Sequence, residues 1–357
     1  MLLITFHGDQ TGIPNVYCLS DGGATLATLA LQGLPSGMTL EELRGLAVYN
    51  GNLYVVVASG PSDSVMGFQG PPNQSSQLSY LGTMIGGGQS IMHPFGIVFD
   101  ASASPAVNCY VSNQDSNVVA QIALTAGSNG LMTGSLGSGC QSSYLSGKYN
   151  ASQFLDGTFV ASQLGKLHKV ARDAPDVKES DGGLGVTGTG KPLKPSNSVR
   201  GVAIANGILF VCDEVDNQVN MYDLTDGKYL GSGTLAKKSA PTHVVIADGG
   251  IWVSADDTLY WSVLPASVSA ASLKFHTVAL PLPPPNNKIG GLSCDDSGNV
   301  YVVFQDGTHT TGTGVIGKYT VTAGTPPTLM AVTTTPGFST FPDTPEFCLW
   351  VSDTWPS

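Results

Sequence analysis

The chain has 357 residues, enough for two ordinary domains or for one large all-β domain. Its 45 glycines and 22 prolines make up nearly a fifth of the sequence and charged residues only 11%, which excludes coiled coils and helical bundles. The formal net charge of −11 repels phosphate backbones and anionic lipid surfaces, so we expect no nucleic-acid partner. No stretch of the sequence approaches the ~20 apolar residues of a membrane span, and we expect none.

The N-terminal residues 1–9 have neither the basic start nor the long apolar segment of a targeting peptide, and they are typical of a strand. The sequence allows more than one cellular compartment. Met1 as the native start favours the cytoplasm, whereas a processed chain could be secreted or lie at a cell surface. The six cysteines fall mostly one per strand group and are predicted to be free core thiols, which favours a reducing compartment.

One pattern recurs along the chain. An apolar strand opens near a glycine, and an Asn-Gly or Asp-Gly turn leads into a second strand rich in aromatic and β-branched residues. A polar loop and a third strand follow. The clearest copy spans 200–223, and four others open near Gly45, Gly96, Val244 and Gly291. Because Asn, Asp and Gly tolerate the positive φ of a type I′ turn, these dipeptides between apolar runs predict hairpins.

The spacing of the copies predicts how many there are. With Gly45, Gly96, Gly201, Val244 and Gly291 as equivalent positions, successive separations are 51, 105, 43 and 47 residues. The second separation is double the first, and a weak copy at 155–171 lies inside it. Repeats of this size, each with three or four strands, predict an all-β, seven-bladed β-propeller that forms a single domain over 1–357. A six-bladed ring with one long insertion at 131–197 is the alternative.

The two ends of the chain are predicted to close the ring. Residues 2–31 supply only the outer strands of a blade, and 347–352 could supply its missing inner strand. Such closure hides sheet edges that would otherwise invite aggregation. The stretch 131–197 is Gly- and Ser-rich at its start and then densely charged. We interpret it as a degenerate blade or as an insertion that could serve as a lid or partner-binding loop.

The blade at 200–223 resembles NHL-type propeller repeats. The positions that carry the resemblance are Gly201, Val202, Ala203, Phe210, Val211, Asp213, Asn217, Val219, Tyr222 and Asp223. It implies a fold rather than one function, because similar propellers serve as lactonases, lyases, glycan binders and protein-interaction platforms. Regucalcin- and gluconolactonase-like propellers hold a metal in the channel, but Gly290 stands where their ligand Asp would be. Glu41 and Glu42 precede Arg44 and open no inner strand, so that ligand set is absent.

Five potentially cationic residues stand where inner strands begin, near the predicted channel mouth: Arg44, His93, Arg200, His243 and Lys288. Together they could attract a carboxylate, sulfate or phosphate. Alternatively, each side chain could bond a carbonyl or an acidic loop residue of a neighbouring blade. Acidic residues also recur in the polar loops, where they could bind Ca²⁺ or fix turns by accepting backbone N–H bonds. We predict no other cofactor.

These features favour a non-catalytic binding or assembly module whose ligand is a glycan, a small anion or a protein partner on one face of the ring. A homo-oligomer or a polymer is a further form of assembly that the composition allows. The competing class is a metal-dependent, lactonase-like hydrolase or a lyase at the channel mouth. No catalytic residue is predicted, because no nucleophile motif is present.

Overall fold

The computed structural model describes most of the chain outside 157–198. The described residues are 1–6, 16–20, 25–27, 31–38, 40, 42–58, 63–70, 77–86, 91, 93–102, 108–114, 118–135, 141–144, 154–156, 199–214, 216–225, 227–281, 287–306, 314–334, 344–352 and 355. None of them lies in a helix long and apolar enough to cross a membrane.

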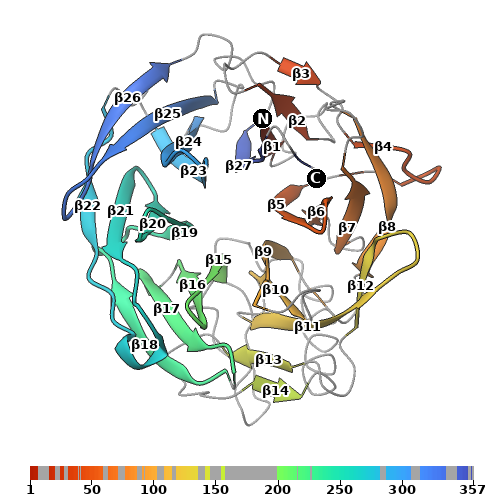
Figure 1. Cartoon of the computed structure of the whole chain (residues 1–357), viewed down its shortest axis with the longest axis horizontal. Coiled ribbons are helices and arrows are strands. Elements are labelled where there is room, and N and C mark those ends of the chain that lie inside the picture. Colours follow the sequence, from red (N-terminus) through yellow and green to blue (C-terminus); the bar gives the residue numbers. More distant parts are fainter. Residues whose placement is uncertain are drawn as a thin grey trace, which may run out of the picture.

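Six sheets, antiparallel throughout except for β4 (Leu31–Gln32), stand around a central axis, each with one strand lining the channel (Figure 1). The strands of each sheet are given from the axis outward. The first sheet contains β27 (Pro345–Trp350), β1 (Leu2–Phe6), β2 (Tyr17–Leu19) and β3 (Thr25–Ala27). The second contains β5 (Leu43–Tyr49), β6 (Asn52–Val57), β7 (Ser64–Gln69), β8 (Leu78–Gly86) and β4, which pairs parallel with β8. The third contains β9 (Pro94–Phe99), β10 (Asn108–Asn113), β11 (Val118–Ala126), β13 (Gln141–Tyr144) and β14 (Phe154–Asp156), and β12 (Met132–Ser135) also pairs with β11.

The remaining three sheets have four strands each and follow one another in chain order. The fourth sheet contains β15 (Val199–Ala205), β16 (Ile208–Asp213), β17 (Gln218–Asp223) and β18 (Tyr229–Thr234). The fifth contains β19 (Pro241–Ala247), β20 (Gly250–Ala255), β21 (Thr258–Val263) and β22 (His276–Val278). The sixth contains β23 (Asn287–Cys294), β24 (Asn299–Asp306), β25 (Val315–Thr322) and β26 (Thr328–Thr334). A 3₁₀ turn, η5 (Val268–Ala270), precedes β22.

The number of sheets corrects the preferred blade count. The described residues form a six-bladed propeller, which is the alternative expected from the sequence, and the seven-bladed prediction is wrong. β13 and β14 extend the sheet of β9, β10 and β11 and begin no new one. Most of the weak copy at 155–171, and most of the expected insertion at 131–197, lie outside the described residues.

The predicted closure of the ring is confirmed. β27 pairs antiparallel with β1, with Leu349 opposite Leu3 and Cys348 opposite Ile4. The amino group of Met1 donates to the Val351 carbonyl at 3.1 Å, and the N and C labels lie close together in Figure 1. One blade therefore takes its inner strand from the C-terminal end of the chain and its outer strands from the N-terminal end, and this pairing closes the ring.

Each junction between neighbouring blades holds one apolar cluster, so the core is a ring of six clusters in the described part of the chain. Fully buried aromatic residues such as Tyr54, Phe210 and Trp252 fill these junctions. Burial of a large apolar side chain contributes about 1.5–3 kcal/mol. Five cysteines are described, and all five are free thiols, four of them buried in this core.

Candidate functional site

Every inner strand changes register at the same level, close to its opening. The shifts fall between Leu43 and Leu46 in β5, between Val199 and Val202 in β15, and between Ile289 and Leu292 in β23, with equivalent irregularities in β9, β19 and β27. A β-bulge turns a side chain away from its regular alternation. The bulges therefore direct one set of side chains from different blades toward the axis.

Side chains of the preceding blades hold the bulges in place. Thr5 Oγ1 donates to the Arg44 carbonyl at 2.9 Å, and Ser112 Oγ donates to the Arg200 carbonyl at 2.5 Å. Ser254 Oγ bonds the Gly290 carbonyl in the same way, at 3.0 Å. Since a bulged carbonyl leaves the regular strand ladder, it needs such a partner when buried. These bonds fix the backbone positions from which the channel-mouth side chains project.

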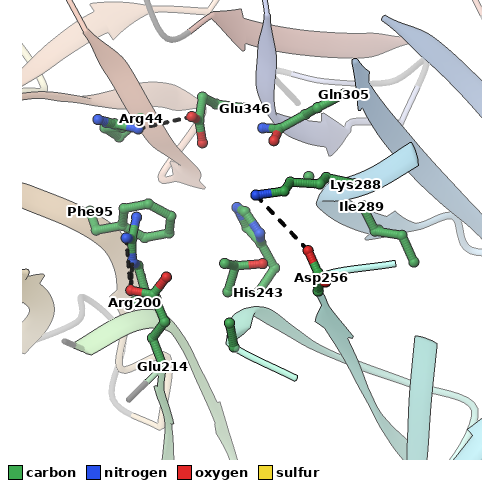
Figure 2. A pocket seen from close by; sticks show the side chains of 13 residues that line it. Arg44, Phe95, Arg200, Glu214, His243, Asp256, Lys288, Ile289, Gln305 and Glu346 are labelled. Atoms are coloured by element: carbon green, nitrogen blue, oxygen red, sulfur yellow. Dashed lines mark hydrogen bonds and ion pairs between the residues drawn. The ribbon is translucent and has the colours of Figure 1, made fainter. Parts of the chain in front are cut away.

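A cavity of about 200 Å³ lies at the channel mouth (Figure 2). Four of the five predicted cationic residues line it, namely Arg44, Arg200, His243 and Lys288. They come from β5, β15, β19 and β23, so four blades converge on one space. His93 does not line this cavity: its Nε2 lies 3.6 Å from Glu42 Oε2, and its backbone N–H donates to Asp63 Oδ2 at 2.8 Å.

Each of the arginine and lysine side chains of the lining has an acidic neighbour. Arg44 Nη1 lies 2.9 Å from Glu346 Oε1, and Arg200 Nη2 lies 2.8 Å from Glu214 Oε2. Lys288 Nζ is 4.0 Å from Asp256 Oδ1, and its side chain is 51% exposed. The lining is thus a balanced set of donors and acceptors. Only Asp256 is an acidic loop residue of a neighbouring blade, the kind of partner that the sequence alternative expected. Glu346 lies in the inner strand β27, and Glu214 belongs to the same blade as Arg200.

Two aromatic rings, those of Phe95 and His243, line the cavity, and a third, that of Phe347, packs against both. The centroid of His243 lies 4.2 Å from that of Phe347 and 5.4 Å from that of Phe95, and the two phenylalanine rings are 5.0 Å apart. Burial lowers the pKa of His243 to about 3, an effect that the charges of Arg200 and Arg44 add to and that of Glu346 opposes. His243 is therefore neutral at physiological pH and adds no positive charge to the mouth.

The sequence pattern did not identify Phe95, Glu214, Gln305 or Glu346 as lining residues. A signal existed for Glu346: once 347–352 is accepted as the closing inner strand, the residue just before it, Glu346, aligns with Arg44 and Arg200. Glu214 directly follows the aromatic strand β16, within reach of the opening of β15.

Acidic residues of the polar loops fix turns where the structure describes them. Asp213 Oδ1 accepts the backbone N–H of Asp216 at 3.1 Å, and Asp295 Oδ1 accepts that of Asn299 at 2.8 Å. Among the described residues, no three His, Cys, Asp or Glu side chains gather in a way that could hold a metal ion. Ca²⁺ binding stays a prediction, because several loop acids, Asp9 and Asp115 among them, lie outside that part of the chain.

No protein-family model and no curated protein matches the chain. Solved structures do match its fold. The match to a Lactobacillus plantarum protein covers 93% of this chain and 81% of that protein, at 14% identity and a TM-score of 0.54. The match to the periplasmic gluconolactonase PpgL of Pseudomonas aeruginosa covers 93% of this chain and 81% of that protein, at 12% identity and a TM-score of 0.53. The match to a putative 6-phosphogluconolactonase from Bacteroides fragilis covers 93% of this chain and 80% of that protein, at 12% identity and a TM-score of 0.52. At these identities the likeness shows the fold alone: the chain is a β-propeller similar in architecture to these proteins.

Proposed function

We propose that the protein is a non-catalytic binding propeller whose channel mouth holds a small, hydroxyl-bearing carboxylate such as a sugar acid. The observation that carries the proposal is the convergence of Arg44, Arg200 and Lys288, from three blades, on one cavity. Guanidinium and ammonium groups are the strongest side-chain partners of a carboxylate.

The balance of the lining favours a ligand that both donates and accepts hydrogen bonds. Glu214, Asp256 and Glu346 present carboxylate oxygens, which ligand hydroxyl groups can satisfy. Lys288 is the most exposed of the three cations and its acidic partner is the most distant, so it is the first group to meet a ligand carboxylate. A ligand that carried only negative charge would meet repulsion from the three acids.

Titration calorimetry with gluconate tests this proposal. We expect the wild type to bind it, and the Lys288→Gln variant to bind about tenfold or more weakly, because a charge-assisted hydrogen bond contributes about 1.5–3 kcal/mol. Lys274→Gln, which removes an exposed lysine outside the cavity lining, is the matched control and should leave the affinity unchanged. Equal binding of glucose and gluconate, or no binding of either, would contradict a carboxylate site at the mouth.

Lactone hydrolysis is the second candidate, and the names of two similar structures favour it. The mouth offers little to such a reaction, because neutral His243, with a pKa of about 3, is a weak general base and each lining carboxylate has a cationic neighbour. Acid release from gluconolactone measures it directly. A rate above the uncatalysed one that disappears in Glu214→Gln would replace the binding proposal with the hydrolase.

A further inference from the structure

We propose that Phe95 is a positioning residue of the channel mouth: its ring holds the guanidinium groups of Arg44 and Arg200 in the orientation that a ligand meets. The Arg200 Cζ lies 4.8 Å from the centroid of the Phe95 ring, and the Arg44 Cζ lies 5.7 Å from it. Both distances are within the range of cation–π attraction. The consequence for binding rests on the function proposed above, but the arrangement of the two arginines does not.

The position of Phe95 in the ring explains why one residue can serve two arginines. Its strand, β9, packs between β5 and β15, which carry Arg44 and Arg200. Phe95 stands at the bulge of β9, at the level where the other two strands present their arginines, and Figure 2 shows its ring beside Arg200. The ring is 1% exposed. Attraction between a cation and an aromatic face is stronger where water is excluded.

Each guanidinium is restrained in two different ways. Carboxylates fix the N–H edges: Glu214 Oε2 accepts from Arg200 Nε at 2.9 Å, and Glu346 pairs with Arg44. An edge contact alone lets the planar group rotate about that contact, whereas a ring beside it also restrains the plane. Because an ordered arginine loses less conformational entropy when a ligand binds, this arrangement pre-organises the site.

Phe95 is itself held firmly enough to act as a support. The rings of Phe347 and His243 pack against it at centroid distances of 5.0 and 5.4 Å. The next backbone N–H, that of Gly96, donates to Ser112 Oγ at 2.8 Å, and the same hydroxyl donates to the Arg200 carbonyl. A single serine thus sets the distance between the bulge that carries the ring and the bulge that carries the arginine.

Phe347→Leu provides a matched control for Phe95→Leu. Phe347 packs in the same aromatic cluster as Phe95 and His243, but in the described part of the chain no cationic side chain lies over its ring. Both substitutions remove an aromatic ring from the same cluster, and the general loss of packing should therefore be similar. Only Phe95→Leu removes the face beside the two guanidinium groups.

The ligand-free test is NMR of the arginine Nε–Hε groups in the intact protein. In the wild type the Arg200 Hε resonance should show a ring-current shift, which should disappear in Phe95→Leu and persist in Phe347→Leu. Absence of the shift in the wild type, or its equal loss in both variants, overturns the proposal. This readout does not depend on any ligand, so it stands even if gluconate fails to bind.

The second test measures gluconate affinity with phenylalanines of increasing fluorination at position 95. Fluorine weakens the negative face of the ring while its shape changes little, so the affinity should fall stepwise to about a fifth or a tenth of the wild-type value. An affinity that does not respond to fluorination, in a protein that binds gluconate, overturns the positioning role. If the NMR shift is present and no gluconate binds, the arrangement of the arginines is upheld and the proposed ligand is wrong.

Discussion

A Gly201→Ala variant should lose about 3 kcal/mol of unfolding free energy, because the added methyl group would overlap the backbone of the next blade. A Cβ at position 201 would lie 2.7 Å from His243 Cα, 2.8 Å from the Thr242 carbonyl oxygen and 2.9 Å from Val244 N. No side-chain rotation relieves contacts with backbone atoms. The two inner strands must instead separate, and the closed ring resists this at every other junction.

Urea unfolding measures the effect of Gly201→Ala, and Gly86→Ala is its control. Gly86 lies at the end of β8, and a Cβ there would meet only Thr83 Cγ2, at 3.9 Å. That variant should therefore match or slightly exceed the wild type in stability, by about 0.5 kcal/mol. If both variants unfold at the same urea concentration as the wild type, the close approach of the inner strands is not what Gly201 provides.

The hairpins were predictable because their cause is local. Asn50–Gly51, Asn206–Gly207 and Asp248–Gly249 all have positive φ at both residues. The values are close to 50° at the first residue and to 70° at the second in each pair. Two neighbouring residues decide this geometry without help from the rest of the chain. Such turns fixed the strand pairs of the clear repeats, and through them the fold class.

The blade count was not predictable, because it depends on where a strand pairs rather than on whether it forms. Phe154–Asp156 is a strand, but it pairs with β13 and extends an existing sheet. The double separation of 105 residues suggested a seventh unit, but the described strands inside it belong to the sheet of β9, β10 and β11. Sequence spacing alone cannot distinguish a long connection from a degenerate blade.

The position of the candidate site in the fold was predictable, but the ion-pair partners and charges of its residues were not. Repeat alignment placed Arg44, His93, Arg200, His243 and Lys288 at one mouth, and all of them except His93 line the cavity. Their partners are set by tertiary contacts, and Glu346 reaches Arg44 only because the two ends of the chain share the ring. The neutrality of His243 likewise arises from burial among rings, which spacing does not reveal.

Asp213 is an acid whose burial makes stability depend on pH. It ends β16 with no exposed surface, and burial raises its pKa to about 7, the nearby charge of Asp216 acting in the same direction. Hydrogen bonds from the Asp216 backbone N–H and from Asn220 Nδ2, at 3.1 and 3.4 Å, oppose the shift without cancelling it. The folded protein therefore holds a proton on Asp213 at pH values where the unfolded chain has released it.

The sign of the effect follows from this difference. Because the folded state binds the proton more tightly, the stabilisation from Asp213 is complete below the pKa of the unfolded chain and is lost as the pH rises to about 7. Relative to Asp213→Asn, which is neutral throughout, the wild type should lose about 4 kcal/mol of unfolding free energy between about pH 4 and about pH 8. Urea unfolding of both proteins across this range measures the change in their difference.

Asp257→Asn separates this effect from the general titration of acidic residues. Asp257 is an exposed loop carboxylate of the next blade that accepts a hydrogen bond from Thr258 Oγ1. Since water already surrounds Asp257, its replacement should give a stability curve parallel to that of the wild type. An Asp213→Asn curve that also stays parallel to the wild type would show that the folded protein pays no penalty for an ionised Asp213, and that solvent or a counter-charge reaches the end of β16.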